Sequence, residues 1–189
     1  MIYVFVGPSA SGKTEVSKFF QGQKINFNID EDLMKNHVVL PKNITSTTRV
    51  PRGGEKHGVD YYFLLPKVFV KKIDNNEFAE YAEVFGKFYG LEKKELEKHL
   101  NSILVYDPQG VETLKKSTQN IVSIYFDISA EVSLERMIDR KDNSSDIEKR
   151  MKDLQYFLDY KDKCDHVVDC NRDINLVIKD INNIIEYYN

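Results

Sequence analysis

One run of residues has the types and the spacing that phosphate chemistry needs: Gly7-Pro8-Ser9-Ala10-Ser11-Gly12-Lys13-Thr14. It fits the phosphate-binding loop pattern G-x-x-x-x-G-K-[ST]. In such a loop the glycines let the backbone curl, so that successive N–H groups face phosphate oxygens. Lys13 is expected to reach the β- and γ-phosphates of a nucleotide, and the Thr14 hydroxyl to bind Mg²⁺. The run therefore predicts a nucleotide site, without yet indicating a reaction.

A second polar segment, residues 45–55, reads Thr-Ser-Thr-Thr-Arg-Val-Pro-Arg-Gly-Gly-Glu. Hydroxyl groups and forked guanidinium donors together suit the binding of a phosphate group. Glu55 is expected to hold one of the two guanidinium groups in place. The same composition also fits a polar surface loop, so on its own this segment leaves both interpretations open.

Short apolar runs indicate the strands that must position these loops. They lie at residues 1–6, 102–106, 120–128 and 166–168, and a shorter run at 38–40 ends at Pro41. The first run precedes the phosphate-binding loop, and Val16, Phe19 and Phe20 follow the loop at helical spacing. Strand, loop and helix in this order are what the motif requires.

Helical spacing of apolar residues fills the gaps between the predicted strands. It occurs around residues 69–73, 111–115, 132–138 and 147–158, with a polar gap at 142–146 that indicates a hinge or loop tip. An amphipathic stripe over 174–185 predicts a final helix packed on the core. Strands that alternate with helices imply an α/β fold with a parallel sheet.

Composition limits the class of protein. The chain has 189 residues, which favours one domain, and its net charge of −3 argues against a chain that binds nucleic acid by bulk electrostatics. The apolar start lacks the basic residues of a signal peptide, and no apolar stretch approaches membrane-spanning length. Cys164 and Cys170 flank His166, too few ligands for a metal site, and are interpreted as small apolar residues. We therefore expect a cytoplasmic protein without nucleic-acid or membrane partners.

Further motifs follow the phosphate-binding loop in a fixed order: T-S-T-T-R-x-P-R-x-G-E, G-V-D-Y-x-F, E-F-x-E-x-A-x-x-x-G-x-x-Y-G and D-x-Q-G. In these motifs the chain resembles guanylate kinases over almost its whole length. The resemblance implies a P-loop three-layer α/β fold with a central parallel sheet, an inserted nucleoside monophosphate-binding subdomain and a helical lid. The implied parts are a core of 1–43, 92–135 and 154–189, a GMP-binding subdomain of 44–91 and a lid of 136–153.

The resemblance also implies how the acceptor nucleotide is held. In the family, the arginines that match Arg49 and Arg52 bind the GMP phosphate, and the glutamate that matches Glu55 supports them. The tyrosines that match Tyr61 and Tyr89 donate hydroxyl hydrogen bonds to the same phosphate. These five positions carry the residue types that the family uses.

For the acceptor base, the resemblance implies that Glu80 reads the guanine edge and that Thr45 assists. Guanine presents N1–H and a 2-amino group side by side, and one carboxylate accepts from both. Adenine offers an acceptor at N1 and no 2-amino group, so the carboxylate would stay unpaired, and such a site rejects it by about 10⁴-fold. Asp107 matches an aspartate placed between the two nucleotides, near the metal and the acceptor.

The donor ATP with Mg²⁺ is assigned, by the same resemblance, to the phosphate-binding loop and a lid. Arg136 and Arg140 are four residues apart on one helix face, and Arg150 follows on the next helical segment; lid closure over ATP keeps water from the γ-phosphoryl group. The implied catalytic residues are Lys13, Arg49, Asp107, Arg136, Arg140 and Arg150. The implied ATP-binding residues are Gly7, Ser9, Ala10, Ser11, Gly12, Lys13, Thr14 and Asn171, the last at the adenine, with Thr14 also binding the metal.

Some positions depart from the family pattern: Leu91, Val105, Phe88, Phe85 and a longer segment at 21–42. The first two remove polar groups close to the acceptor. The expected reaction is therefore ATP + (d)GMP to ADP + (d)GDP, in a monomer or homodimer. The alternatives are a kinase of another nucleoside monophosphate or of ribose 1,5-bisphosphate, and a catalytically inactive binding module.

Overall fold

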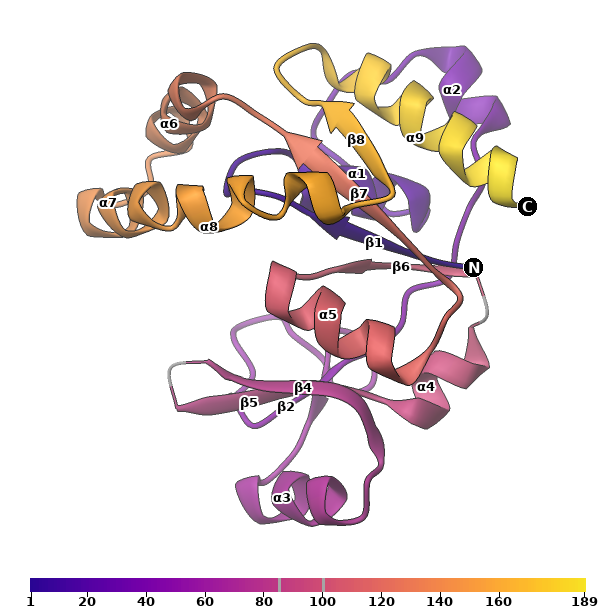
Figure 1. The fold of residues 1–189 in the computed structure, drawn as a ribbon, viewed down its shortest axis with the longest axis vertical. Helices are drawn as coiled ribbons and strands as arrows, with labels where there is room; N and C mark the ends of the chain where they lie inside the picture. Colours follow the sequence, from indigo (N-terminus) through magenta and orange to yellow (C-terminus); the bar gives the residue numbers. More distant parts are fainter. Residues whose placement is uncertain (85, 100) are drawn as a thin grey trace.

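The computed structural model describes residues 1–84, 86–99 and 101–189. Figure 1 shows a parallel sheet flanked by helices and, beside it, a second small sheet with helix α3 (Pro66–Asp74) at its far end. The chain thus has the α/β architecture with a central parallel sheet that the sequence predicts.

The central sheet is parallel, and its strands lie in the order β6-β1-β7-β8. They are β1 (Ile2–Val6), β6 (Ser102–Val105), β7 (Ile121–Asp127) and β8 (His166–Asp169). Each lies within or next to a predicted apolar run, which confirms those predictions. The run at 38–40 forms no strand: Leu40 is buried, and its N–H donates to the Phe20 carbonyl at 2.7 Å.

Helices cover both faces of the central sheet, because side chains of successive strand residues point to opposite faces. Tyr3 and Phe5 of β1 pack in one apolar cluster with α1 (Lys13–Phe20) and α9 (Ile174–Tyr188). Ile2, Val4 and Val6 pack in a second cluster with α5 (Pro108–Ser117). The predicted stripe of α9 is confirmed, since its buried residues include Val177, Ile178, Ile181 and Ile185.

The segment predicted as one helical stretch at 147–158 is divided. Helix α7 (Ser144–Lys152) and helix α8 (Leu154–Leu158) follow α6 (Ala130–Asp139). The polar gap is also shorter than expected, because Asn143 caps α7: its side chain accepts from the N–H of Asp146 at 2.8 Å. Residues 144–146 are therefore helical rather than part of the loop.

The second sheet has the order β3-β2-β5-β4 and is mixed. Its strands are β2 (Ser46–Thr47), β3 (Tyr62–Phe63), β4 (Phe78–Val84) and β5 (Lys87–Glu92). The β4–β5 ladder shifts register between Phe78 and Glu80. Helix α5 packs against β4 and so connects the two sheets, with α4 (Lys93–Lys98) following β5.

The longer segment at 21–42 carries helix α2 (Glu31–Asn36), which lies beside α9 (Figure 1). Of the two cysteines, Cys170 is buried and Cys164 half-buried, and burial raises the pKa of Cys170 to about 12 and of Cys164 to about 11. A short 3₁₀ helix, η1 (Lys161–Lys163), precedes β8. Among the residues that the structure describes, none of the helices combines the length and the apolarity needed to cross a bilayer.

Candidate active site

The phosphate-binding loop connects β1 to α1 and depends on two glycine conformations. Gly7 has a φ of 147°, and a Cβ there would lie 2.6 Å from the Phe126 carbonyl oxygen, so β7 leaves no space for a side chain. Gly12 has a φ of 95° and precedes α1 as its N-cap. A left-handed residue at this point costs little only for glycine. The loop therefore ends with its N–H groups at a helix N-terminus, where anions bind.

Lys13, the first residue of α1, folds back over this loop. Its Nζ donates to the carbonyl oxygens of Gly7 at 2.7 Å and Pro8 at 2.5 Å, and to Ser11 Oγ at 3.0 Å. Desolvation lowers the pKa of Lys13 to about 8. A poorly hydrated cation with neutral partners has much to gain from an anion placed in the loop.

A cavity of about 1060 Å³ opens above the loop. The loop residues 9–14 line it, and the first turn of α9 contributes Ile174 and Val177 to the lining. Arg136, Arg140 and Arg150 line it as well. The structure thus brings together the loop and the three arginines that the sequence assigns to a lid, which lie more than 100 residues from the loop in the sequence.

The three arginines are held in different ways. Arg136 on α6 donates to the carbonyl oxygens of Ala10 at 3.2 Å and Cys170 at 2.9 Å, and so ties the helix to the loop. Arg140 donates to Asp142 through Nε at 2.8 Å and Nη2 at 2.5 Å. Arg150 donates to the same carboxylate at 2.9 Å. Asp142, which lines the cavity, therefore forms ion pairs with both Arg140 and Arg150.

Asn171 is placed differently from the expected adenine contact. Its Oδ1 accepts from the N–H of Ser129 at 2.8 Å, and its Nδ2 donates to Asp169 at 2.8 Å. It is not among the residues that line the cavity, whereas its neighbours Arg172 and Asp173 are. Adenine contact by Asn171 stays a prediction.

Arg49 follows β2 and is fixed by a fork of two hydrogen bonds. Its Nη1 and Nη2 donate to Glu55 Oε2 at 2.9 Å and Oε1 at 2.8 Å. The pair lowers the pKa of Glu55 to about 2, chiefly through the Arg49 hydrogen bonds and then through the N–H of Arg52, 2.7 Å from Oε2. The expectation that Glu55 holds one guanidinium in place is confirmed, and that guanidinium is Arg49.

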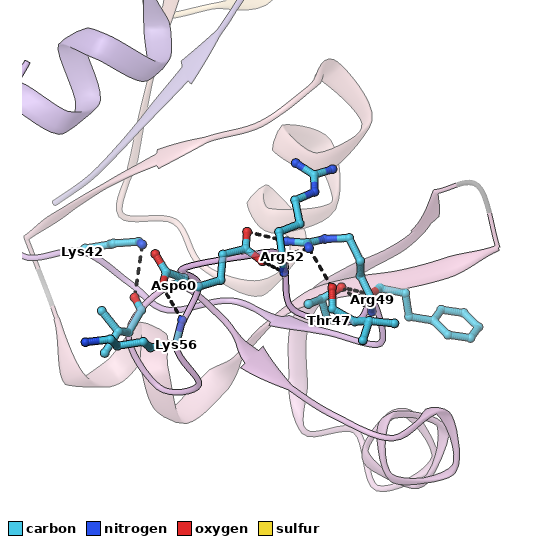
Figure 2. A network of polar contacts seen from close by, with 10 residues as sticks. Lys42, Thr47, Arg49, Arg52, Lys56 and Asp60 are labelled. Carbon is cyan, nitrogen blue, oxygen red and sulfur yellow. Dashed lines mark hydrogen bonds and ion pairs between the residues drawn. The ribbon is translucent and has the colours of Figure 1, made fainter. Parts of the chain in front are cut away.

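Two aromatic rings and a second arginine lie next to this pair. The Arg49 guanidinium carbon is 5.3 Å from the ring centre of Tyr61, and the rings of Tyr61 and Tyr89 are 6.3 Å apart. The Arg52 guanidinium makes no ion pair within the part of the chain that the structure describes. In Figure 2 it extends away from the contacts around Arg49 and Thr47. Arg49 and the rings of Tyr61 and Tyr89 therefore lie close together, and Arg52 lies on the same loop.

Glu80 lies on β4 just after the register shift, and such bulges re-aim side chains. Ala82 pairs with Tyr89 in the β4–β5 ladder. Glu80 is two residues from Ala82, so it lies on the same face of the sheet as Tyr89. Thr47 of β2 pairs with Tyr89 of β5. Thr45 lies two residues before Thr47, and the Thr45 carbonyl oxygen accepts from the N–H of Tyr62 at 2.9 Å.

Glu80 is only 6% exposed, and its carboxylate oxygen Oε2 makes no hydrogen bond of ordinary geometry in the described ranges. Burial first, and then the charge of Asp107, raise the pKa of Glu80 to about 7. The hydroxyl of Tyr106 is also buried and makes no hydrogen bond of ordinary geometry in the described ranges, and burial, the Glu80 and Asp107 charges and its approach to the Glu80 carboxylate raise its pKa. Unpartnered buried polar atoms are costly, so this cluster is suited to a ligand that donates hydrogen bonds.

Asp107 lies at the end of β6 and caps α5. Its Oδ1 accepts from the Gly110 N–H at 2.7 Å, and Pro108 occupies the first turn. The second carboxylate oxygen, Oδ2, accepts no hydrogen bond from the residues that the structure describes. The residue therefore has a structural function in addition to the expected place between the nucleotides.

Comparison with known proteins adds an independent observation. The sequence model described as "Guanylate kinase" matches residues 1–188. The chain belongs to the guanylate kinase family. It is 32% identical over 191 residues to the guanylate kinase of Fusobacterium nucleatum subsp. nucleatum, with 98% of this chain and 95% of that protein covered.

A second guanylate kinase gives agreement in both sequence and structure. The chain is 34% identical over 193 residues to the guanylate kinase of Anaplasma phagocytophilum, covering 98% of this chain and 85% of that protein. The crystal structure of guanylate kinase from the same organism superposes with a TM-score of 0.65 at 28% identity, over 99% of this chain and 85% of that one.

Positions that depart from the guanylate kinase pattern have different environments. Leu91 pairs with Glu80 and is fully buried in the apolar cluster beneath the second sheet. Val105 is 38% exposed at the end of β6. The ring of Phe88 stacks on Phe69 of α3, 5.4 Å between centres. Phe85 lies outside the described residues.

Tyr106 and Asp142 belong to the candidate site and were not identified from the sequence. Tyr106 directly precedes Asp107, and its position at the end of a predicted strand is the signal that was available. Asp142 lies in the polar gap already recognised as a loop, and an acidic residue between two arginine-bearing helices was the signal there.

Thr14 is the residue that the sequence assigns to a metal. It is exposed and lines the cavity next to Lys13. Within the described ranges, no group of three or more His, Cys, Asp or Glu side chains is placed to hold a metal ion. A lone hydroxyl at a phosphate site fits Mg²⁺, which keeps most of its waters and takes its remaining oxygens from phosphates.

Proposed function

We propose that the protein transfers the γ-phosphoryl group of ATP to the phosphate of GMP, giving ADP and GDP. The observation that carries this proposal is the buried Glu80 carboxylate with its unpartnered Oε2, on the sheet face that also bears Tyr89. A purine with two adjacent donors satisfies that carboxylate, and guanine is such a purine. The deoxy nucleotide dGMP carries the same base and is also an expected acceptor.

The acceptor phosphate is proposed to lie against Arg49, Arg52, Tyr61 and Tyr89. Because Glu55 already fixes Arg49 through two hydrogen bonds, little side-chain freedom is lost when the phosphate binds. Thr45 is proposed to assist Glu80 at the base. An acceptor phosphate largely ionised near neutral pH needs no general base, so alignment and charge neutralisation carry the reaction.

The donor side is proposed to act through Lys13, the loop residues Gly7, Ser9, Ala10, Ser11 and Gly12, and the lid arginines. Lys13 exchanges its carbonyl partners for phosphate oxygens. Arg136, Arg140 and Arg150 neutralise charge on the transferred group, the latter two after leaving Asp142. Asp107 uses its second oxygen to orient the acceptor side. Mg²⁺, held by Thr14 together with the phosphates, supplies further charge neutralisation when bound.

The division of the chain is part of the proposal: a core of 1–43, 92–135 and 154–189, an acceptor subdomain of 44–91 and a lid of 136–153. Closure of the last two over the core expels water from the transferred group. We propose the cytoplasm, where ATP and GMP meet, as the compartment. Kinase alternatives that lack a base in the acceptor leave Glu80 without a function and are not favoured.

The experiment is a measurement of ADP release with Mg-ATP and a panel of acceptors: GMP, dGMP, AMP, UMP, CMP and ribose 1,5-bisphosphate. The proposal expects turnover with GMP and dGMP alone, and loss of that turnover in Glu80→Ala and Lys13→Ala. Turnover with another acceptor in preference to GMP would refute it, and so would GMP binding without turnover.

A further inference from the structure

The segment at 21–42 crosses the edge of the nucleotide cavity and carries an exposed aromatic residue there. Phe27 is 51% exposed and lines the cavity that holds Lys13 and the arginines. Its neighbours Ile25 and Ile29 pack against the apolar core, but Phe27 is not part of that core. The ring therefore remains at the cavity rim instead of being buried with the residues beside it.

Specific contacts to α9 fix the position of the Phe27 loop. Asn175 Nδ2 donates to the carbonyl oxygen of Asn28 at 3.2 Å, and Asn175 Oδ1 accepts from the N–H of Asp30 at 3.0 Å. Further along, Asn182 Oδ1 accepts from the N–H of Val38 at 3.1 Å. Two asparagines on one helix thus hold the segment on both sides of α2.

The residues that line the cavity are of two chemical kinds, because Phe27 is apolar and aromatic whereas Lys13 and the arginines are cationic. Ile174 and Val177 at the start of α9 also line it. These three side chains offer apolar surface and an aromatic face, whereas the loop amides, Lys13 and the arginines offer positive charge. A ligand that joins a flat aromatic base to a polyphosphate matches both kinds of lining.

We propose that Phe27 is a donor-base contact: its ring covers one face of the ATP adenine while the phosphates lie in the loop. This inference rests on the ATP-dependent reaction proposed above. Stacking needs no hydrogen-bond pattern, so Phe27 increases affinity for a base without selecting adenine over guanine. Asn175 is then a positioning residue, because it holds the loop that carries the ring.

The first test compares binding of Mg-ATP and of Mg-tripolyphosphate, which lacks a base, by titration calorimetry. Phe27→Ala is expected to weaken ATP binding about tenfold, the loss typical of one stacked base, and to leave tripolyphosphate unchanged. Met34→Ala is the matched control, since Met34 is 55% exposed on the same segment but does not line the cavity. Equal weakening of both ligands, or unchanged ATP binding, would overturn the inference.

A second variant detects the contact between residue 27 and the base by fluorescence, without an activity assay. The chain has no tryptophan, so Phe27→Trp introduces a single indole and keeps an aromatic ring. ATP is expected to quench its fluorescence and tripolyphosphate is not, and ATP affinity is expected to stay near that of the parent protein. Fluorescence that responds equally to both ligands would contradict a base contact.

Failure of this inference and failure of the proposed function give different results. If GMP is phosphorylated but Phe27→Ala leaves the KM for ATP unchanged, the reaction stands and the base contact is refuted. If GMP is not phosphorylated but ATP binding depends on Phe27 as described, the base contact stands and the acceptor is wrong. Asn175→Ala is expected to raise the KM for ATP without lowering kcat.

Discussion

The two carboxylate oxygens of Glu55 accept from the two terminal nitrogens of Arg49, at 2.8 and 2.9 Å. This geometry aligns a planar guanidinium before any ligand binds, because both nitrogens are committed to one plane. Arg52 lies on the same loop and makes no ion pair among the described residues. Its side chain extends away from the Arg49 contacts (Figure 2). One arginine is therefore fixed and the other is free to reach an incoming phosphate.

Substitution Glu55→Gln is expected to raise the KM for GMP by about 10- to 100-fold, since a small misplacement of an aligning group costs that much. The KM for ATP is expected to stay the same, because Glu55 does not line the nucleotide cavity. Steady-state kinetics with each substrate varied in turn measures both constants. Glu31→Gln, which breaks an exposed pair with Lys35 on α2, is the control; an unchanged KM for GMP in Glu55→Gln would contradict the positioning role.

GMP affinity is expected to depend on the ionisation of Glu80, whose pKa burial raises to about 7. Guanine donors favour the carboxylate over the carboxylic acid, so GMP lowers this pKa on binding. Affinity should therefore increase as pH rises from 6 to 8, with release of a proton, and level off above. Calorimetry in buffers of different ionisation enthalpy measures the proton count.

The control for this prediction is Glu80→Gln, which cannot release that proton. Phosphate itself ionises near pH 6, but that contribution is common to both proteins and cancels in the difference.

The pH dependence of the folding stability of the free protein gives a second check on the pKa of Glu80. Because the folded pKa of Glu80 exceeds the unfolded value, the folded state binds more protons between about pH 4.3 and 7, and stability falls as pH rises through that window. In Glu80→Gln this fall should be smaller.

ATP affinity is expected to depend on pH in the opposite direction. Desolvation lowers the pKa of Lys13 to about 8, and only the protonated amine attracts phosphate. Binding of ATP should therefore weaken as pH rises above 8, and be accompanied by proton uptake at that pH. Lys13→Ala should remove this dependence and lower kcat by about 10²–10³-fold, as for other single electrostatic contacts. A pH profile of the Lys13→Ala protein identical to that of the parent would exclude Lys13 as the cause.

Asp107 combines a helix cap with an expected place between the nucleotides, and two substitutions separate these roles. Asp107→Asn keeps an oxygen for the Gly110 N–H and removes the charge, so the melting temperature should be retained while kcat falls. Asp107→Ala removes both and is expected to cost a further ~1 kcal/mol of stability. Thermal unfolding and steady-state kinetics on the same samples test this. Full activity in Asp107→Asn would show that the residue is only a cap.

The sequence was most informative where function depends on local spacing. The loop from Gly7 to Thr14, the strand before it, the helix after it and the stripe of α9 follow from patterns within a few residues. The Arg49–Glu55 pair belongs to this class as well, because the partners are only six positions apart in one loop. Such features need no knowledge of distant contacts.

Features that depend on tertiary contacts were not predictable in the same way. Asp142 binds both Arg140 and Arg150 only because α6 and α7 pack together. Tyr106 approaches Glu80 only because α5 packs on β4 and so joins the two sheets. The position of Phe27 depends on hydrogen bonds to Asn175, about 150 residues away in the chain. The register shift before Glu80 cannot be recognised in the pattern of apolar residues, although such a bulge changes the direction of the side chains beside it.

The most direct test of the central claim is the ratio of kcat/KM for GMP to that for AMP, measured side by side in the parent protein and in Glu80→Gln. A buried carboxylate that reads guanine predicts a ratio of about 10⁴ or more in the parent and a large decrease in the variant. Comparable turnover of AMP and GMP by the parent, or a ratio that Glu80→Gln leaves unchanged, would contradict it.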